Sequence, residues 1–232
     1  MYHLIFLVNG NGGNFKFIHQ TIKLNILKNI KITILATQRC TAIDYSKNQN
    51  IDHYILDYSR FDDNLKKNFF SLLKSLQPDL IITTWNKIID EETVNYFYGK
   101  MINLHYSLLP SFAGLTGIKP IQEAYHCRCK FIGPTCHFVD KEVDSGKIIA
   151  QAAFPTDITE SEAISKMFKT GCLVLINGIL LTLDQQSIVV NPKFIGEYRQ
   201  HNDILFNPPL KINPSIFNNH FWETINLITI SK

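Results

Sequence analysis

An amide, an imidazole and a carboxylate are the side chains of this sequence whose types and places suit acyl-transfer chemistry. Asn103 and His105 close a short apolar run, and alternation along a strand puts both on the same face. A carboxylate can come from the stretch 140–146, which lies between two apolar runs and contains Asp140, Glu142 and Asp144; nothing in the composition distinguishes Asp144 from the others. An acid–base pair moves protons while an amide or imidazolium stabilises an oxyanion, so the three form a workable set. Taken singly, a histidine at a strand end is usually a structural residue whose hydrogen bonds are satisfied, and an acidic run is usually a solvated turn.

A second candidate is the glycine-rich turn 9–14, which follows the first apolar run. Small residues at Gly12 and Gly13 let backbone N–H groups approach an anion, and the helix predicted to follow adds its dipole. A phosphate site at Gly12, Gly13 and Asn14 is one interpretation. The other is a tight strand-to-helix turn that needs glycine for its backbone angles alone.

Strand and helix patterns alternate through the first half of the chain. Apolar or β-branched runs predict strands at 3–8, 31–37, 53–58, 80–84 and 101–105. Helical periodicity predicts helices at 14–27, 61–76 and 90–97. This alternation predicts an α/β fold with a mostly parallel sheet and helices on both faces. Ligands of such sheets bind just beyond the carboxyl ends of the strands, where the candidates above lie.

The second half is less regular. It predicts a long loop, a short helix, two strands and a long helix, at 106–117, 120–126, 130–139, 148–153 and 160–183. We place one domain at 1–190 and treat 191–232 as a C-terminal extension of unknown role. The extension contains a candidate closing helix at 214–230. Its other interpretations are a lid and an oligomer contact, for which a homodimer is one candidate assembly.

Composition and charge exclude several classes of protein. The 232 residues are 45% hydrophobic with a formal charge of +3, and no basic block is dense enough to follow a nucleic-acid backbone. The longest apolar run, 172–183, is well short of the roughly 20 residues that a membrane span needs. The first residues lack the pattern of a secretion signal, so we expect a cytoplasmic protein.

The five cysteines do not form the spacing of a disulfide framework or a zinc site. Cys127 and Cys129, with His126 and His137, are the nearest approach to a set of metal ligands. A Cys-x-Cys pair in a helix-to-strand turn is poor ligand geometry, so no metal is expected.

Three segments carry a resemblance to a known family. The stretches Asn103–Gly114, Gly133–Val139 and Val143–Gln151 resemble the folate-dependent formyltransferases. The resemblance implies a Rossmann-like catalytic domain over 1–190 that transfers the formyl group of 10-formyltetrahydrofolate to a small-molecule amine, without a metal. It implies that Asn103 and a protonated His105 stabilise the oxyanion, while Asp144 holds the imidazolium and helps to carry a proton.

The resemblance also places the folate cosubstrate, in a cleft that recognises it largely through backbone groups. The matching residues are Lys87, Ile88 and Ile89 after one strand, and Val139, Asp140 and Val143 in the loop before Asp144. Ordinary core packing is the alternative for Ile88 and Ile89.

Departures from the family pattern concern the amine acceptor. Tyr106 stands where the family usually has proline, Gly13 where the phosphate loop usually has serine, and 115–117 lacks a frequent histidine. A glutamate that usually contacts the ribose is replaced near Gly171 and Cys172. Glycinamide ribonucleotide, of purine biosynthesis, is the first acceptor expected, and a nucleotide-linked amino sugar is the second.

Two further interpretations stay open. Water in place of the amine would make the chain a formyltetrahydrofolate deformylase. A folate-binding protein without turnover belongs to a different class, and the presence of Asn103, His105 and Asp144 together argues against it.

Overall fold

The computed structural model describes residues 1–56, 62–183 and 189–230, so residues 57–58 of the third predicted strand and Phe61 lie outside the described part. The first half alternates strands and helices. In chain order these are β1 (Tyr2–Val8), α1 (Gly13–Lys23), β2 (Ile30–Ala36), α2 (Thr41–Asn48), β3 (Asp52–Ile55), α3 (Asp63–Leu76), β4 (Leu80–Thr84), α4 (Glu91–Tyr96) and β5 (Met101–His105). The two strands that precede the candidate site, β4 and β5, have the predicted bounds.

The second half adds antiparallel strands and the longest helix. Its elements are α5 (Lys119–His126), β6 (Phe131–Ile132), β7 (Thr135–Phe138), β8 (Ile148–Pro155), α6 (Glu160–Leu183), η1 (Pro192–Phe194), β9 (Ile195–His201), β10 (Ile204–Ile212), η2 (Pro214–Ile216) and α8 (Asn219–Ile230). The strand predicted at 130–139 is two strands, broken at Gly133 and Pro134. Pro134 has no N–H for the ladder, and a Cβ at Gly133 would lie 1.7 Å from the Ala152 carbonyl oxygen.

All strands except β6 follow one path through the sheet, in the order β3-β2-β1-β4-β5-β7-β8-β10-β9. Strands β3 to β5 of that order are parallel, and the remaining pairs are antiparallel. The chain reverses its direction of winding between β1 and β4, which opens a crevice at their carboxyl ends. The predicted α/β class with helices on a mostly parallel central sheet is confirmed.

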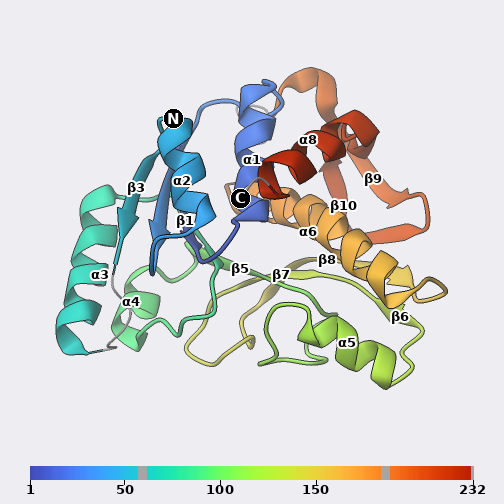
Figure 1. Cartoon of the computed structure of the whole chain (residues 1–232), viewed down its shortest axis with the longest axis horizontal. Helices are drawn as coiled ribbons and strands as arrows, with labels where there is room; N and C mark the ends of the chain where they lie inside the picture. The colour runs from blue at the N-terminus through green and yellow to red at the C-terminus, as the bar shows by residue number, and fades with distance from the viewer. Residues whose placement is uncertain (57–61, 184–188, 231–232) are drawn as a thin grey trace.

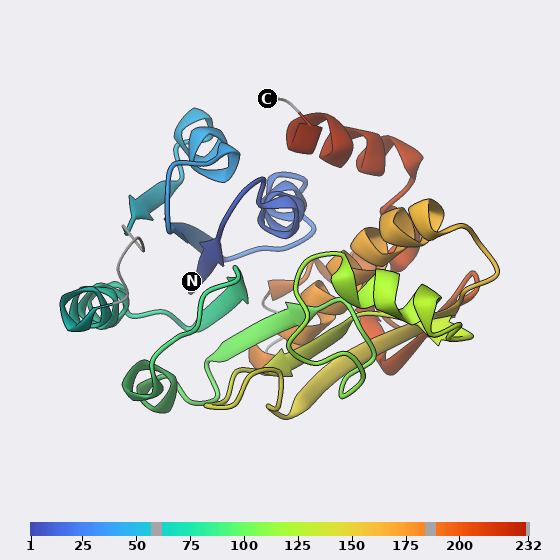
Figure 2. The ribbon, with the colours of Figure 1, turned by 60° about the horizontal axis from the view of Figure 1, so that its bottom comes forward.

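Helices cover both faces of the parallel part. The larger core lies between the sheet and α1, α2 and α6, and the smaller one packs β1 and β4 against α3 and α4. Figures 1 and 2 show α1 and α2 on one side of these strands and α3 and α4 on the other. Burial on both faces explains why β1 and β4 are almost continuously apolar.

Helix α6 is the one helix of the described residues long and apolar enough to cross a membrane, and 67% of its most apolar stretch is buried inside the protein. It packs on β7, β8 and β10 and contacts α1 and α5. The burial identifies α6 as a core helix of this fold.

The described residues of the C-terminal extension complete the sheet and cover α1. Strand β10 pairs with β8, and β9 pairs with β10. Helix α8 packs on α1 through an aromatic cluster in which the Phe17 and Trp222 rings are stacked, with centroids 5.6 Å apart. Phe217 and Phe221 also contact the Phe17 ring. The extension therefore shares its core with the rest of the chain.

We expect Trp222→Ala to lower the free energy of unfolding by about 3 kcal/mol, because removing a buried aromatic side chain leaves a cavity between α1 and α8. Urea denaturation followed by circular dichroism measures the change. Leu227→Ala is the matched control, since Leu227 lies on the same helix and is 72% exposed. Equal effects of the two substitutions would contradict the packing role of Trp222.

Candidate active site

A cleft of about 750 Å³ opens at the carboxyl ends of β1, β4 and β5. Its lining comes from four segments that are far apart in the sequence: the glycine turn, residues 83–89, the loop after β5 and the loop that carries Asp144. Asn9 Nδ2 donates a 2.6 Å hydrogen bond to Asn86 Oδ1 and joins the first two of these segments. The cleft lies where the winding of the sheet reverses, as expected for a ligand site of this architecture.

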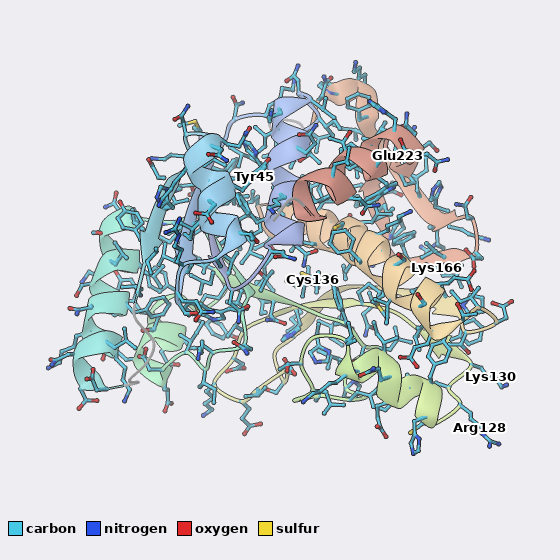
Figure 3. All side chains as sticks on the ribbon, viewed as in Figure 1. Tyr45, Arg128, Lys130, Cys136, Lys166 and Glu223 are labelled. Atoms are coloured by element: carbon cyan, nitrogen blue, oxygen red, sulfur yellow. The ribbon has the colours of Figure 1, made fainter. Side chains whose placement is uncertain are left out.

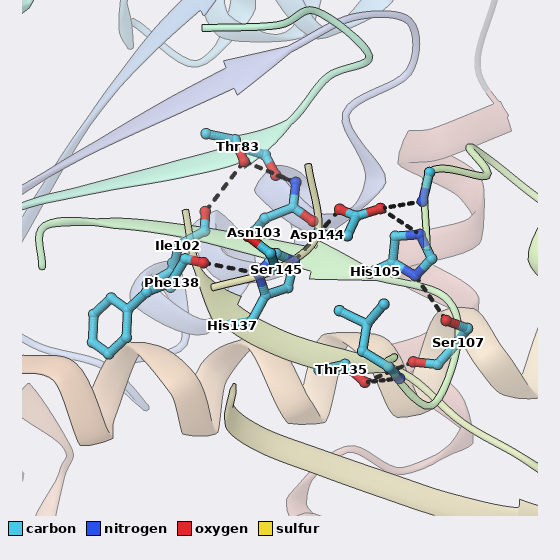
Figure 4. A network of polar contacts seen from close by, with 12 residues as sticks. Thr83, Ile102, Asn103, His105, Ser107, Thr135, His137, Phe138, Asp144 and Ser145 are labelled. Carbon is cyan, nitrogen blue, oxygen red and sulfur yellow. Dashed lines mark hydrogen bonds and ion pairs between the residues drawn. The ribbon is translucent and has the colours of Figure 1, made fainter. Parts of the chain in front are cut away.

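Asn103, His105 and Asp144 come together in this cleft (Figure 4). Asn103 and His105 project from the same face of β5, and the loop after β7 brings Asp144 to them. His105 Nε2 lies 3.2 Å from Asp144 Oδ2, and their side chains are 8% and 12% exposed. The structure thus places the three predicted residues at one point.

Asp144 is held by its backbone and by its neighbours. Its φ of 56° lies in the left-handed region, which a short polar residue such as aspartate tolerates better than most. The Gly114 N–H donates a 2.8 Å hydrogen bond to Asp144 Oδ2. Burial alone would raise the pKa of the Asp144 carboxyl, but the hydrogen bonds from His105 and Gly114 and the nearby imidazoles outweigh it and lower the pKa. Asp144 therefore faces His105 as a carboxylate.

Both ring nitrogens of His105 face hydrogen-bond acceptors. Nε2 lies 2.9 Å from the Leu115 carbonyl oxygen and near Asp144, and neither can donate a proton. Nδ1 lies 3.0 Å from Ser107 Oγ, whose single hydrogen is donated to the Ser111 carbonyl oxygen. Each ring nitrogen therefore has an acceptor within hydrogen-bond distance, so the site has the partners that an imidazolium needs. A cation of this kind can stabilise a developing oxyanion.

A buried network holds Ser107 in position. Thr135 Oγ1 donates a 2.6 Å hydrogen bond to the Ser107 carbonyl oxygen, and it accepts hydrogen bonds from Leu109 N–H and Gln151 Nε2. Thr135 lies directly opposite His105 in the β5–β7 ladder. Sequence reasoning did not find Ser107 or Thr135 as functional, because their importance follows from contacts across the sheet.

Thr83 orients the amide of Asn103. Asn103 Nδ2 donates to the Thr83 carbonyl oxygen at 2.9 Å and to Thr83 Oγ1 at 2.8 Å. A substrate oxygen can accept a hydrogen bond from this amide only by displacing one of these two acceptors. The Thr83 hydroxyl can rotate, so it is displaced more easily than the carbonyl oxygen. Thr83 was also not among the predicted residues.

His137 is a second histidine beside Asp144, on the strand that pairs with β5. Its Nδ1 donates a 2.8 Å hydrogen bond to the Phe138 carbonyl oxygen, because a carbonyl can only accept. Its Nε2 is buried without a hydrogen-bond partner in the described residues and lies 3.7 Å from Asp144 Oδ1. Burial lowers the pKa of His137 and outweighs the attraction of the carboxylate, so the ring is neutral near pH 7. The sequence suggests His137 only as a candidate metal ligand, together with Cys127 and Cys129, and predicts no role for it beside Asp144.

The predicted folate residues Lys87, Ile88, Ile89, Val139, Asp140 and Val143 all line the same cleft. Ile88 and Val143 are 70% and 61% exposed, which is unusual for apolar side chains and rules out core packing for Ile88. This side of the cleft therefore presents apolar surface to a ligand.

The predicted phosphate residues Gly12, Gly13 and Asn14 line the cleft at the start of α1. Gly12 caps the helix with φ 63° and has no side chain to bond the first helical N–H groups. A Cβ at Gly12 would also lie 2.8 Å from Ala42 Cβ on α2, so both the backbone angle and the packing require glycine. The uncapped N–H groups suit an anion.

The described residues contain no group of three His, Cys, Asp or Glu side chains placed to hold a metal ion. Cys127 is exposed at the end of α5, whereas His137 lies beside Asp144. Figure 3 shows Cys136 in the interior and the side chains of Arg128 and Lys130 at the edge of the molecule beyond α5.

Comparison with known proteins identifies the family of this chain. Residues 2–170 match the formyl transferase family. The chain belongs to that family. The chain is 32% identical over 166 residues to a phosphoribosylglycinamide formyltransferase of Haemophilus influenzae, covering 68% of this chain and 76% of that protein.

The chloroplastic phosphoribosylglycinamide formyltransferase of Vigna unguiculata is 30% identical over 161 residues. The match covers 66% of this chain and 51% of the Vigna protein, so the chain spans about half the length of that relative. The solved structure of the phosphoribosylglycinamide formyltransferase from Anaplasma phagocytophilum has a TM-score of 0.70 at 24% identity, over 79% of this chain and 88% of that one. This likeness confirms the fold.

We expect Ser107→Ala to lower kcat for formyl transfer about 10- to 100-fold, since a hydrogen bond to a charged group contributes about 1.5–3 kcal/mol. The substitution removes the acceptor that holds His105 Nδ1–H. Ser145→Ala is the matched control, because Ser145 Oγ donates only to the Glu142 carbonyl oxygen in the neighbouring loop. A rate within twofold of the wild type in Ser107→Ala would contradict the role of Ser107.

The lowered pKa of His137 predicts a pH dependence of stability. The unfolded chain binds a proton on this histidine near pH 6.5, and the folded chain binds it only at lower pH. The contribution of neutral His137 is therefore complete above pH 6.5 and is lost as the pH falls below it. Urea denaturation between pH 8 and pH 5 should show a smaller decline for His137→Gln than for the wild type. The exposed His126, replaced by glutamine, should leave the wild-type decline unchanged; equal declines in all three proteins would refute the prediction.

Proposed function

We propose that this formyl transferase moves the formyl group of 10-formyltetrahydrofolate to the amine of glycinamide ribonucleotide, in purine biosynthesis. The observation that carries the proposal is the His105 imidazole 3.2 Å from the Asp144 carboxylate, in a cleft that also has an apolar side and a glycine turn with uncapped N–H groups. The relatives in Haemophilus influenzae and Vigna unguiculata, both named phosphoribosylglycinamide formyltransferases, support the choice of acceptor.

In this proposal the amine nitrogen attacks the formyl carbon, and the C=O electron pair moves to the oxygen. His105 donates its Nε2 hydrogen to that oxygen in exchange for its contact with the Leu115 carbonyl oxygen. Asn103 adds a second hydrogen bond by exchanging its contact with Thr83. The bond between the formyl carbon and the folate nitrogen then breaks, and the carbonyl re-forms. The amine loses one proton and the folate nitrogen gains one, with Asp144 as the group that helps the transfer, directly or through water.

The two sides of the cleft take different parts of the substrates. Lys87, Ile88 and Ile89 on one segment and Val139, Asp140 and Val143 on the other hold the folate through backbone groups and apolar contact. Gly12, Gly13 and Asn14 hold the phosphate of the acceptor with the first N–H groups of α1. The missing serine hydroxyl at Gly13 leaves these backbone donors in place.

A nucleotide-linked amino sugar is the second acceptor, because Gly171 and Cys172 stand near the place where the family usually has the glutamate that contacts the ribose. The extension gives this alternative no direct support, since the described residues after Asp144 do not line the cleft. Five free cysteines agree with a cytoplasmic location, and we propose no nucleic-acid or membrane partner.

The test is a formyl-transfer assay with 10-formyltetrahydrofolate, followed by absorbance, against glycinamide ribonucleotide, nucleotide-linked amino sugars and no acceptor. We expect turnover with the ribonucleotide and a loss of about 10³-fold in kcat for His105→Ala, since oxyanion donors contribute on this scale. His126→Ala, on the surface at the end of α5, is the control.

Turnover only with an amino sugar would move the enzyme to sugar modification, and turnover without acceptor would make it a deformylase. Full activity of His105→Ala would refute the role of His105. Binding of folate without any turnover would leave the chain as a folate-binding protein.

A further inference from the structure

Tyr106 lies where the cleft turns around the end of β5. It follows His105 directly, and alternation along the strand points its ring to the opposite face, toward α6. Tyr106 nevertheless lines the same cleft as His105, beside Gly12, Gly13 and Asn14. The cleft therefore reaches from the reacting groups, around Tyr106, to the glycine turn.

The ring of Tyr106 occupies the space between α6 and this arm of the cleft. A Cβ at Gly171 on α6 would lie 2.8 Å from Tyr106 Cε1 and 3.3 Å from Leu104 Cδ2, so no larger residue fits behind the ring. No described side chain of α6 lines the cleft. Tyr106 and Gly171 each differ from the family pattern, and the structure shows that they pack against each other.

The phenol of Tyr106 keeps its hydrogen. Burial raises the pKa of the phenol. The Asn14 side chain lowers this pKa, but by less than burial raises it. Asn14 Oδ1 is 3.4 Å from Cys172 Sγ, whose pKa burial also raises, so the thiol donates to Asn14. With its oxygen turned to Cys172, Asn14 has its amide N–H groups left for the phenol oxygen, and no hydrogen bond from the phenol to a described acceptor is found.

This arm of the cleft offers hydrogen-bond donors and no carboxylate. The donors are the first N–H groups of α1, the Asn14 amide and the Tyr106 hydroxyl. A carboxylate would accept hydrogens from sugar hydroxyls, whereas a phenol donates to a sugar oxygen. The arm is therefore suited to a phosphorylated amine with an acceptor oxygen between its phosphate and its amine.

We propose that Tyr106 selects the acceptor, by donating a hydrogen bond to a sugar oxygen of the phosphorylated amine, and that Asn14 and Gly171 position it for this. The inference rests on the proposed function, because it assumes that the acceptor's phosphate binds at the glycine turn. Tyr106 acts in binding and takes no part in proton transfer.

Equilibrium binding by calorimetry tests the proposal without turnover. Tyr106→Phe keeps the ring and removes the donor, so we expect about tenfold weaker binding of glycinamide ribonucleotide. Binding of 2-aminoethyl phosphate, which lacks the sugar, and of tetrahydrofolate should not change. Tyr96→Phe is the matched control, because Tyr96 is 54% exposed and lies outside the cleft lining. Gly171→Ala, which forces the ring toward the cleft, should also weaken ribonucleotide binding.

Unchanged ribonucleotide binding in Tyr106→Phe would show that Tyr106 only packs, and would overturn the inference. Equal losses for all three ligands would show a structural effect and overturn it as well. Wild-type protein that binds the ribonucleotide, with the expected loss in Tyr106→Phe, but transfers no formyl group would refute the proposed reaction and leave the inference standing. Wild-type protein that does not bind the ribonucleotide would overturn both.

Discussion

The contact between the His105 imidazole, which the proposed reaction needs in its protonated form, and the Asp144 carboxylate is the interaction on which the rest of the site depends. Two opposite charges in a half-buried cleft attract strongly, but each also loses hydration, so both need further hydrogen bonds to persist. Gly114 provides one for Asp144, and Ser107 and Leu115 provide them for His105. The long loop after β5 supplies all three, which explains why it folds tightly over the end of the strand.

Much of this arrangement could be predicted from the sequence. The bounds of β4 and β5 follow from short apolar runs, and alternation along β5 placed Asn103 and His105 on one face. The resemblance to formyltransferases added Asp144, which nothing in its acidic surroundings distinguishes from Asp140 or Glu142. Its place in the cleft depends on a left-handed backbone angle and on a hydrogen bond from a residue 30 positions away.

What could not be predicted lies across strands. Thr83 and Thr135 are unremarkable residues in apolar runs, and their hydroxyls matter only because neighbouring strands bring them to Asn103 and Ser107. The break at Gly133 and Pro134 was missed because an apolar pattern continues through it. The link between Tyr106 and Gly171 joins a strand end to a helix far along the chain, and a single sequence contains no signal for such a pair.

The β5–β7 ladder places Asn103 directly opposite His137 and His105 directly opposite Thr135. Because side chains opposite each other in an antiparallel pair lie on the same face, this one register aligns Asn103, His105 and His137 at the cleft and Thr135 in the buried layer beside them. The chain leaves β5 after His105 and enters β7 at Thr135. The pairing of β5 with β7 fixes the position of Thr135 relative to His105. Between these two strands, the loop 106–117 carries the hydrogen-bond partners of His105 and Asp144. The spacing of the reacting groups therefore depends on the strand register together with this loop, so a change of length between His105 and Leu115 would separate the imidazole from its partners even with the ladder intact.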